Sequence, residues 1–156
     1  MSLRFAVAVA LACAELACAS GPPRPQGTAW LPAPAPGVGR LILYRVNDTD
    51  ATMFHPQITV DGLPVGELTI GTFLYLDRSP GVHEIWVKKQ PNVSAFGGQA
   101  PIRPIAVLLA PAAASYVRFE VNSTPVWVEA TLIPMNPADA LSDLATLTEA
   151  TPPGED

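Results

Sequence analysis

The strongest constraint on the fold is a two-residue alternation of apolar and polar side chains that recurs through residues 38–135. A period of two is typical of β-strands with one buried face, whereas an amphipathic helix repeats every three to four residues. The alternation therefore predicts eight short strands and no helix in this stretch. The strands are expected at residues 40–46, 57–61, 64–68, 72–77, 83–89, 105–110, 115–121 and 126–133.

The segments between these strands carry turn-forming residues. Asp61 and Gly62 both tolerate positive φ, so they predict a two-residue type I′ hairpin turn. Proline, glycine and serine mark further turns at 79–81, 96–98 and 123–125. Many short strands separated by such turns predict an all-β fold, a β-sandwich of about seven strands, formed by one domain over residues 38–135.

A different pattern begins after the last predicted strand, in residues 136–156. Asn136 can cap a helix, Pro137 suits the first helical position, and Asp139 favours the positive helix N-terminus. Leu141, Leu144 and Ala145 then share one face, so we expect one short helix over 137–147. The last nine residues, 148–156, are expected to form a frayed acidic tail.

The first nineteen residues have the anatomy of an export signal. Arg4 precedes an apolar run over residues 5–14, which is too short to cross a bilayer as a helix because that requires about 20 residues. A cation, a short apolar core and small residues at the end are typical of a secretory signal peptide. We therefore assign residues 1–19 to a signal peptide.

Three ways of ending this signal remain open. Ala17 and Cys18 resemble the lipobox of bacterial lipoproteins, in which a peptidase cuts before a cysteine that receives diacylglycerol. Glu15 departs from that pattern, and Cys13 is a cleaner local match with a shorter apolar core. Ordinary cleavage after Ala19 would instead release a soluble periplasmic protein. We take lipidation at Cys18 as the main expectation, with Cys13 as the alternative.

The region between signal and domain, residues 20–37, contains six of the chain's eighteen prolines. Proline removes a backbone donor and fixes φ, so this region cannot lie inside a helix or sheet. It predicts a polyproline-like tether that reaches about 50 Å at roughly 3.1 Å per residue.

Composition excludes several functions. A net charge of −5 argues against a nucleic-acid partner, which would require clustered cations. Both cysteines precede residue 20, so the domain itself offers no disulfide, thiol nucleophile or cysteine metal ligand. Phosphate-loop, dinucleotide and metalloprotease motifs are absent from the sequence, and we expect no cofactor and no metal.

The order of short motifs from residue 39 to 121 resembles a known family. Val-Asp-Gly at 60–62, Val-Gly at 65–66 and Pro-Gly-x-His at 80–83 precede a tyrosine-containing strand at 115–121. This order resembles the uncharacterised bacterial lipoproteins filed as domain of unknown function 2846 and, more distantly, PEGA-like domains. The resemblance implies export, lipid anchoring and a prealbumin-like β-sandwich, and it implies no known reaction. Residues 112–114 are alanines where the family has a glycine.

His83 is the side chain best suited to chemistry, because histidine titrates near neutral pH. The alternation points it inward with Ile85, which predicts a structural histidine bonded to the backbone of the adjacent turn. The alternative is a soluble periplasmic hydrolase-like enzyme that uses His83 with Asp61 or Asp77. His55 is expected in a solvated loop.

A candidate contact face follows from the outward positions of the strands. Aromatic and arginine side chains are enriched in protein-binding surfaces. Alternatively, the strands divide between two sheets, and some of these side chains pack beneath the C-terminal helix. The residues of the candidate face are Tyr44, Trp86, Tyr116, Arg118 and Trp127.

Together these features predict a non-catalytic β-sandwich lipoprotein tethered in the bacterial envelope, with a binding or structural accessory role. The partners expected are the membrane, through the lipid, and an envelope protein or glycan. Ala19 is not the aspartate associated with inner-membrane retention, so we expect the outer membrane, facing the periplasm.

Overall fold

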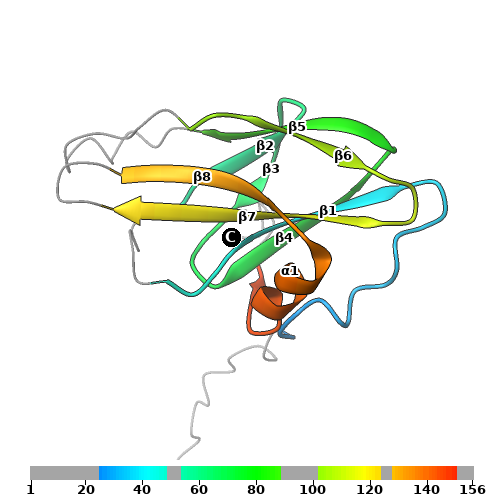
Figure 1. Ribbon diagram of the computed structural model, residues 1–156, viewed down its shortest axis with the longest axis horizontal. Coiled ribbons are helices and arrows are strands. Elements are labelled where there is room, and N and C mark those ends of the chain that lie inside the picture. Colours follow the sequence, from blue (N-terminus) through cyan, green and yellow to red (C-terminus); the bar gives the residue numbers. More distant parts are fainter. Residues whose placement is uncertain (1–24, 49–53, 89–101, 124–127, 151–156) are drawn as a thin grey trace, which may run out of the picture.

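The computed structural model describes residues 25–48, 54–88, 102–123 and 128–150, which form two stacked β-sheets and one helix (Figure 1). The five-stranded sheet has the order β8-β7-β1-β4-β9, and the four-stranded sheet has the order β3-β2-β5-β6. The strands are β1 (Gly39–Arg45), β2 (Gln57–Val60), β3 (Leu63–Glu67), β4 (Thr72–Arg78), β5 (Gly81–Lys88), β6 (Ile105–Leu109), β7 (Ala114–Ser123), β8 (Val128–Met135) and β9 (Thr148–Glu149).

This arrangement confirms the all-β sandwich with a short C-terminal helix. The eight predicted strands lie within two residues of β1 to β8 at each end. The described residues hold nine strands rather than about seven: the eight expected from the alternation all form, and β9 is too short to leave a periodic pattern. The predicted Phe96-Gly97-Gly98 turn and part of the predicted 123–125 turn lie outside the described residues.

The core lies between the two sheets and is built from alternate residues of the strands. Leu41 and Leu43 of β1 face this core, as do Val117 and Phe119 of β7, which runs parallel to β1. Burial of such side chains contributes about 1.5–3 kcal/mol each. Ile85 and His83 of β5 are buried as well, which confirms the inward direction predicted for them.

A second apolar cluster covers the outer side of the five-stranded sheet. It joins Ile42, Tyr44 and Phe73 to Ala140 and Leu144 of the helix α1 (Pro137–Leu144). The Asn136 side chain caps α1 by accepting a hydrogen bond from the Asp139 amide at 3.0 Å. Leu141, predicted on the buried face, is 48% exposed, and Ala140 is buried in its place.

The predicted frayed tail does not begin at residue 148. The helix ends at Leu144, and the chain then adds β9 to the sheet edge beside β4. The Ala150 amide donates to the Phe73 carbonyl at 2.8 Å, and both Leu147 and Ala150 are buried. Apolar side chains at 147 and 150 keep this segment on the domain, and residues 151–156 lie outside the described residues.

The proline-rich segment is also not a free tether over its described part. Leu31 packs into the second cluster, and Trp30 meets Tyr75 edge to face with ring centroids 6.4 Å apart. The Gly27 amide donates to the Leu147 carbonyl at 2.7 Å. Residues 25–37 therefore belong to the folded unit, which is larger than the 38–135 domain expected from the sequence.

Two turns depend on left-handed backbone. Asp61 has φ 52° and Gly62 has φ 77°, and they join Val60 to its partner Leu63, which confirms the two-residue hairpin turn. Ala112 has φ 55° in the turn between β6 and β7. The alanine run replaces the glycine of the resembled family here, yet it adopts the conformation for which glycine is favoured.

Candidate functional site

The predicted contact face does not form one surface. Tyr44 lies on β1 and is fully buried, while Tyr116 and Arg118 lie beside it on β7 and are half-buried. All three belong to the outer side of the five-stranded sheet, which α1 covers. Trp86 lies on β5 in the other sheet. Alternation marks which side chains point away from the core, but it does not show to which of the two sheets a strand belongs. Trp127 lies outside the described residues.

A polar network fixes α1 onto its sheet. The Tyr44 hydroxyl donates to Asp143 Oδ2 at 2.9 Å, and Arg118 Nη1 lies 3.3 Å from the same oxygen. Arg118 also pairs with Glu120. Burial, together with the hydrogen bond to Asp143, raises the pKa of Tyr44 well above its ordinary value. These side chains hold the helix on the sheet.

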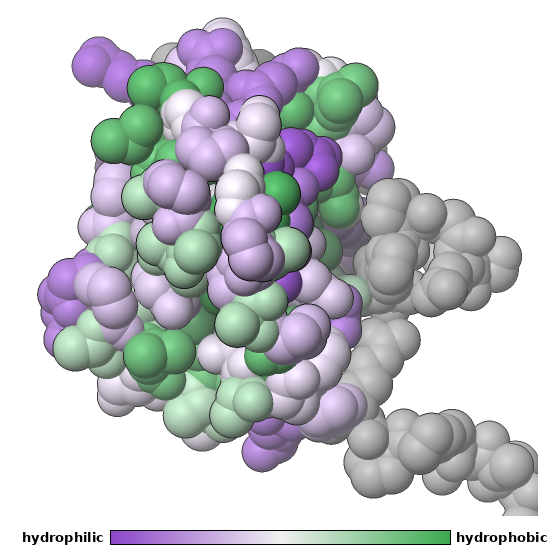
Figure 2. Space-filling view, turned by 90° about the vertical axis from the view of Figure 1, so that its right-hand side faces the viewer, coloured by the Kyte–Doolittle hydropathy of each residue, from purple (hydrophilic) through white to green (hydrophobic). Residues whose placement is uncertain are grey.

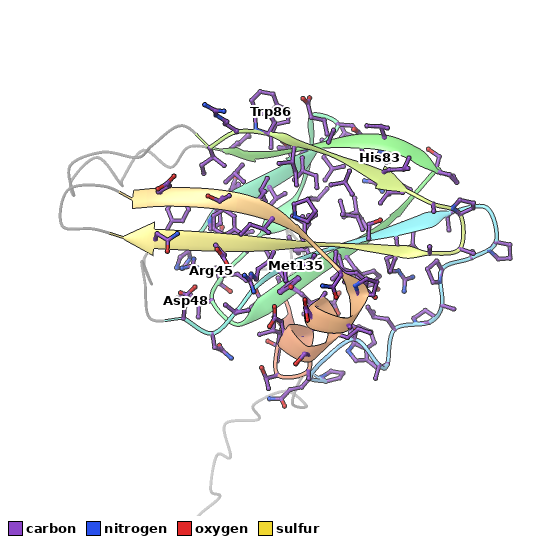
Figure 3. All side chains as sticks on the ribbon, in the orientation of Figure 1. Arg45, Asp48, His83, Trp86 and Met135 are labelled. Carbon is purple, nitrogen blue, oxygen red and sulfur yellow. The ribbon has the colours of Figure 1, made fainter. Side chains whose placement is uncertain are left out.

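The outer side of the four-stranded sheet is the surface that remains open in the described part of the chain. Figure 3 shows Trp86 pointing away from the sandwich on this side. Val82 is 68% exposed, Leu108 67% and Trp86 44%, and Val82 lies directly across from Leu108 in the β5–β6 pairing. We call this surface the exposed sheet face. Its residues on β5 and β6 are Val82, Glu84, Trp86, Lys88, Ala106 and Leu108, and Gln57 and Thr59 of β2 lie beside Lys88 and Trp86 on the same side.

The exposed sheet face mixes apolar and charged side chains. Along β5 the outward residues are Val82, Glu84, Trp86 and Lys88, so an acid and a base flank the tryptophan. Hydrophobic and hydrophilic residues are likewise mixed along the upper part of the space-filling view, where this sheet lies (Figure 2). A large aromatic side chain among aliphatic residues and single charges is the composition that protein contact surfaces favour.

His83 is buried and bonded on both ring nitrogens. Nδ1 lies 2.6 Å from Asp61 Oδ2, and Nε2 lies 2.8 Å from the Ser79 carbonyl oxygen. Asp61 Oδ1 in turn accepts from the Glu84 amide at 3.0 Å. The imidazole thereby connects the turn between β2 and β3 with the turn between β4 and β5. Figure 3 labels His83 on β5.

The two partners of this histidine favour its protonated form. A carboxylate and a carbonyl both accept hydrogen bonds, and the imidazolium form, with two N–H groups, satisfies both. The Asp61 carboxylate and then the Ser79 carbonyl raise the pKa of His83, while the hydrogen bond from His83 and then the Glu84 amide lower the pKa of Asp61. An imidazolium with both donors engaged has no lone pair with which to act as a base.

The other carboxylate considered for a hydrolase is engaged elsewhere. Asp77 receives Arg40 through both oxygens, at 2.7 and 2.8 Å, and Arg40 also donates to the Pro32 carbonyl. Arg40 lies over the Tyr75 ring, 5.1 Å from its centroid. This group fastens the proline-rich segment to the sheet, which is a structural role.

The two histidines do not converge on a metal site. His55 Nδ1 lies 2.9 Å from Glu67 Oε1 at the start of β2, whereas His83 meets Asp61 after the other end of that strand. Across residues 25–48, 54–88, 102–123 and 128–150, no three His, Cys, Asp or Glu side chains are grouped to hold a metal ion.

Sequence reasoning missed the buried arginine at the end of β1. Arg45 is fully buried, its Nη1 donates to the Phe54 carbonyl at 2.6 Å, and its guanidinium lies over Phe119. Burial lowers the pKa of Arg45, and Asp48 at 3.5 Å opposes that shift. The alternation contained the signal, because position 45 shares the inward parity of Leu41 and Leu43. Through these contacts Arg45 ties Asp48 and Phe54 to the end of β1; Figure 3 labels Arg45 and Asp48.

Comparison with known proteins adds no relative: no family model, curated protein or solved structure matches the chain. In the part of the chain that the structure describes, no helix is both long enough and apolar enough to span a membrane.

Proposed function

We propose that the protein is a non-catalytic binding module of the bacterial envelope, anchored by lipid at Cys18, and that it contacts a partner protein through the exposed sheet face. One observation carries the proposal: α1 and the proline-rich segment cover one outer side of the sandwich, while the other presents Trp86, Val82 and Leu108 to solvent. Exposed apolar side chains interspersed and rimmed with polar residues are typical of interaction sites.

The chemistry of this surface favours a protein over a glycan. A sugar would stack on Trp86 and require polar side chains close around it for its hydroxyl groups. Polar side chains do lie next to Trp86, because Thr59 pairs with it across the sheet and Glu84 and Lys88 flank it on β5. Val82 and Leu108 form a separate exposed aliphatic pair that a sugar would leave uncovered, and this pair suits an apolar patch of a protein.

Lipid anchoring rests on the export signal and on the resemblance to the lipoproteins of domain of unknown function 2846. Two or three acyl chains on one cysteine would hold the domain stably, whereas a single chain binds only marginally. With Ala19 after the cysteine, the location we propose is the outer membrane, facing the periplasm.

A cross-linking experiment tests the contact surface. A photoreactive amino acid is placed at Val82 on the exposed sheet face or at the exposed residue Ala138 on α1. We expect the Val82 position to yield a discrete protein adduct in intact cells and the Ala138 position to yield none. The partner is then purified, and Trp86→Ala should weaken its binding by about tenfold, as expected for an aromatic anchor. Adducts from Ala138 alone, or unchanged binding by Trp86→Ala, would reject this surface.

Labelling with radioactive palmitate tests the anchor. The wild-type chain should incorporate the label and Cys18→Ala should not. Incorporation that survives in Cys18→Ala but is lost in Cys13→Ala moves the anchor to Cys13. A wild-type chain that takes up no palmitate refutes lipidation.

A further inference from the structure

The docked proline-rich segment determines where the chain leaves the domain toward its anchor. Gln26 bridges to Thr148 of β9, and the Gly27 amide donates to Leu147. Both contacts lie beside the end of α1, on the side of the molecule away from the exposed sheet face (Figure 1). At Pro25, the first described residue, the chain that leads back to Cys18 therefore departs from the α1 side of the domain.

Docking also shortens the connection between the domain and the anchor. A free tether over residues 20–37 would reach about 50 Å. With residues 25–37 held on the domain, only seven residue steps separate Cys18 from Pro25. Seven residues span about 25 Å at full extension.

The thickness of the molecule sets the scale for comparison. Sheets stack about 10 Å apart and a helix is about 10 Å across, so the exposed sheet face lies about 30 Å from the far side of α1 once side chains are added. Placing the exposed sheet face on the bilayer would require the connection to run past this thickness, which about 25 Å of fully extended chain does not cover. Extending every residue of the connection costs conformational entropy and gains no contact.

We propose that the anchored domain stands on its own membrane with the α1 side toward the bilayer and the exposed sheet face directed away from it. This inference rests on the proposed anchor at Cys18. It narrows the partner to a protein, or the aqueous portion of a protein, that reaches the domain from the side away from the bilayer. Residues 137–156 carry five acids and no bases, so the α1 side is not drawn flat onto anionic headgroups.

Energy transfer to a lipid dye measures this orientation. The mature chain has no cysteine after Cys18, whose sulfur the lipid occupies, so one added cysteine can be labelled alone. A donor dye is attached at Ser142→Cys on α1 or at Val82→Cys on the exposed sheet face, both exposed positions. In vesicles with a short-range acceptor lipid, we expect transfer from residue 142 to exceed transfer from residue 82 by roughly twofold, given a thickness of about 30 Å. Equal or reversed transfer overturns the proposal.

Two variants show whether docking causes the orientation. An insertion of about twelve Gly and Ser residues before Pro25 should remove the difference between the two positions, because the longer linker spans the molecule. Leu31→Asp should do the same at unchanged length by releasing the segment from the second cluster. A difference that persists in both variants contradicts the role of docking.

A chain that carries a fluorescent amino acid at residue 142 or 82 in place of the added cysteine, and that is coupled at Cys18 to a maleimide lipid, separates this inference from the proposed function. If the cell does not lipidate Cys18 but the coupled chain shows the twofold difference, the anchor is wrong and the geometric argument holds. If the chain is lipidated and the difference is absent, the orientation is wrong and the anchor stands.

Discussion

At the scale of single residues, Ala112 occupies a conformation that favours glycine. Its φ of 55° follows Pro111, and the Ala113 amide donates to the Ala110 carbonyl at 3.4 Å, as in a turn with proline at its second position. An L-residue in this region costs about 1–2 kcal/mol. The Ala112 amide donates to Val38 at 2.7 Å, which helps hold the turn in place.

Ala112→Gly should therefore stabilise the protein. Relief of the left-handed strain is partly offset by the greater flexibility of glycine in the unfolded chain, so we expect a gain of about 0.5–1 kcal/mol. The free energy of urea unfolding measures it. The matched control is Ala114→Gly at the start of β7, which should lose about 0.5–1 kcal/mol. Destabilisation by Ala112→Gly would contradict the strain argument.

The His83–Asp61 pair makes stability depend on pH in a defined direction. His83 has a raised pKa, so its contribution is complete below the ordinary histidine pKa of about 6.5 and is lost as pH rises through the folded value. Asp61 has a lowered pKa, so its contribution is present above about pH 4 and is lost as pH falls through its folded value. Arg78 and Glu84 are the other charged groups nearby, and Arg78 partly opposes the shift of His83.

We expect the pair to contribute most between about pH 4 and 6.5. The wild type should lose more unfolding free energy between about pH 5.5 and 8.5 than Asp61→Asn, which keeps the turn and the bond from the Glu84 amide but removes the charge. NMR titration should place the pKa of His83 above that of free histidine and lower it in Asp61→Asn. Glu84→Gln is the control, and an equal pH response in Asp61→Asn would refute the coupling.

At the scale of elements, α1 and the proline-rich segment share the task of covering one sheet. The helix supplies Ala140 and Leu144, the segment supplies Leu31, and polar contacts from Tyr44 and Arg40 hold each in place. A helix of eight residues is not stable alone, so its contacts with the sheet sustain it.

Tyr44→Phe tests the attachment of α1. It removes the donor to Asp143 while keeping the ring, and we expect a loss of about 1 kcal/mol of unfolding free energy. Tyr116→Phe is the control, because Tyr116 lies beside Tyr44's strand in the same cluster. Equal losses in the two variants would show that the Asp143 bond has no special weight.

Leu31→Ala distinguishes a docked segment from a free tether. Because Leu31 is partly buried in the second cluster, we expect a loss of about 1 kcal/mol in urea unfolding. Ala35→Ser at an exposed position of the same segment should change stability by less than about 0.5 kcal/mol. A Leu31→Ala chain as stable as the wild type would contradict docking.

At the scale of the whole molecule, the two sheets give neighbouring residues of one strand opposite roles. Ile85 of β5 is fully buried in the core between the sheets, while Trp86 projects into solvent. The layers therefore separate what stabilises the fold from what is available to a partner. Gly39 allows this close stacking, since a Cβ there would lie 2.8 Å from both Ala110 O and Leu109 Cβ.

Adjacent substitutions on β5 should separate stability from binding. Ile85→Ala should cost about 2–5 kcal/mol in urea unfolding because it leaves a cavity in the core. Trp86→Ala should change stability far less, yet weaken binding of the cross-linked partner. If Trp86→Ala unfolds the domain as readily as Ile85→Ala, then Trp86 serves the fold and the exposed sheet face loses its main anchor.

The sequence alone determined the strands, their inward faces and the Asp61–Gly62 turn, because period-two alternation and positive φ are local properties. The alternation also places position 45 on the inward face of its strand, and the sequence places His83 next to the turn at residues 79–81. Tertiary structure alone decided that β1 and β7 pair in parallel, that Asp61 meets His83, and that Leu31 and Leu147 are buried. Both outer sides of the sandwich look alike in sequence, and long-range packing of α1 and residues 25–37 covers one and leaves the other exposed.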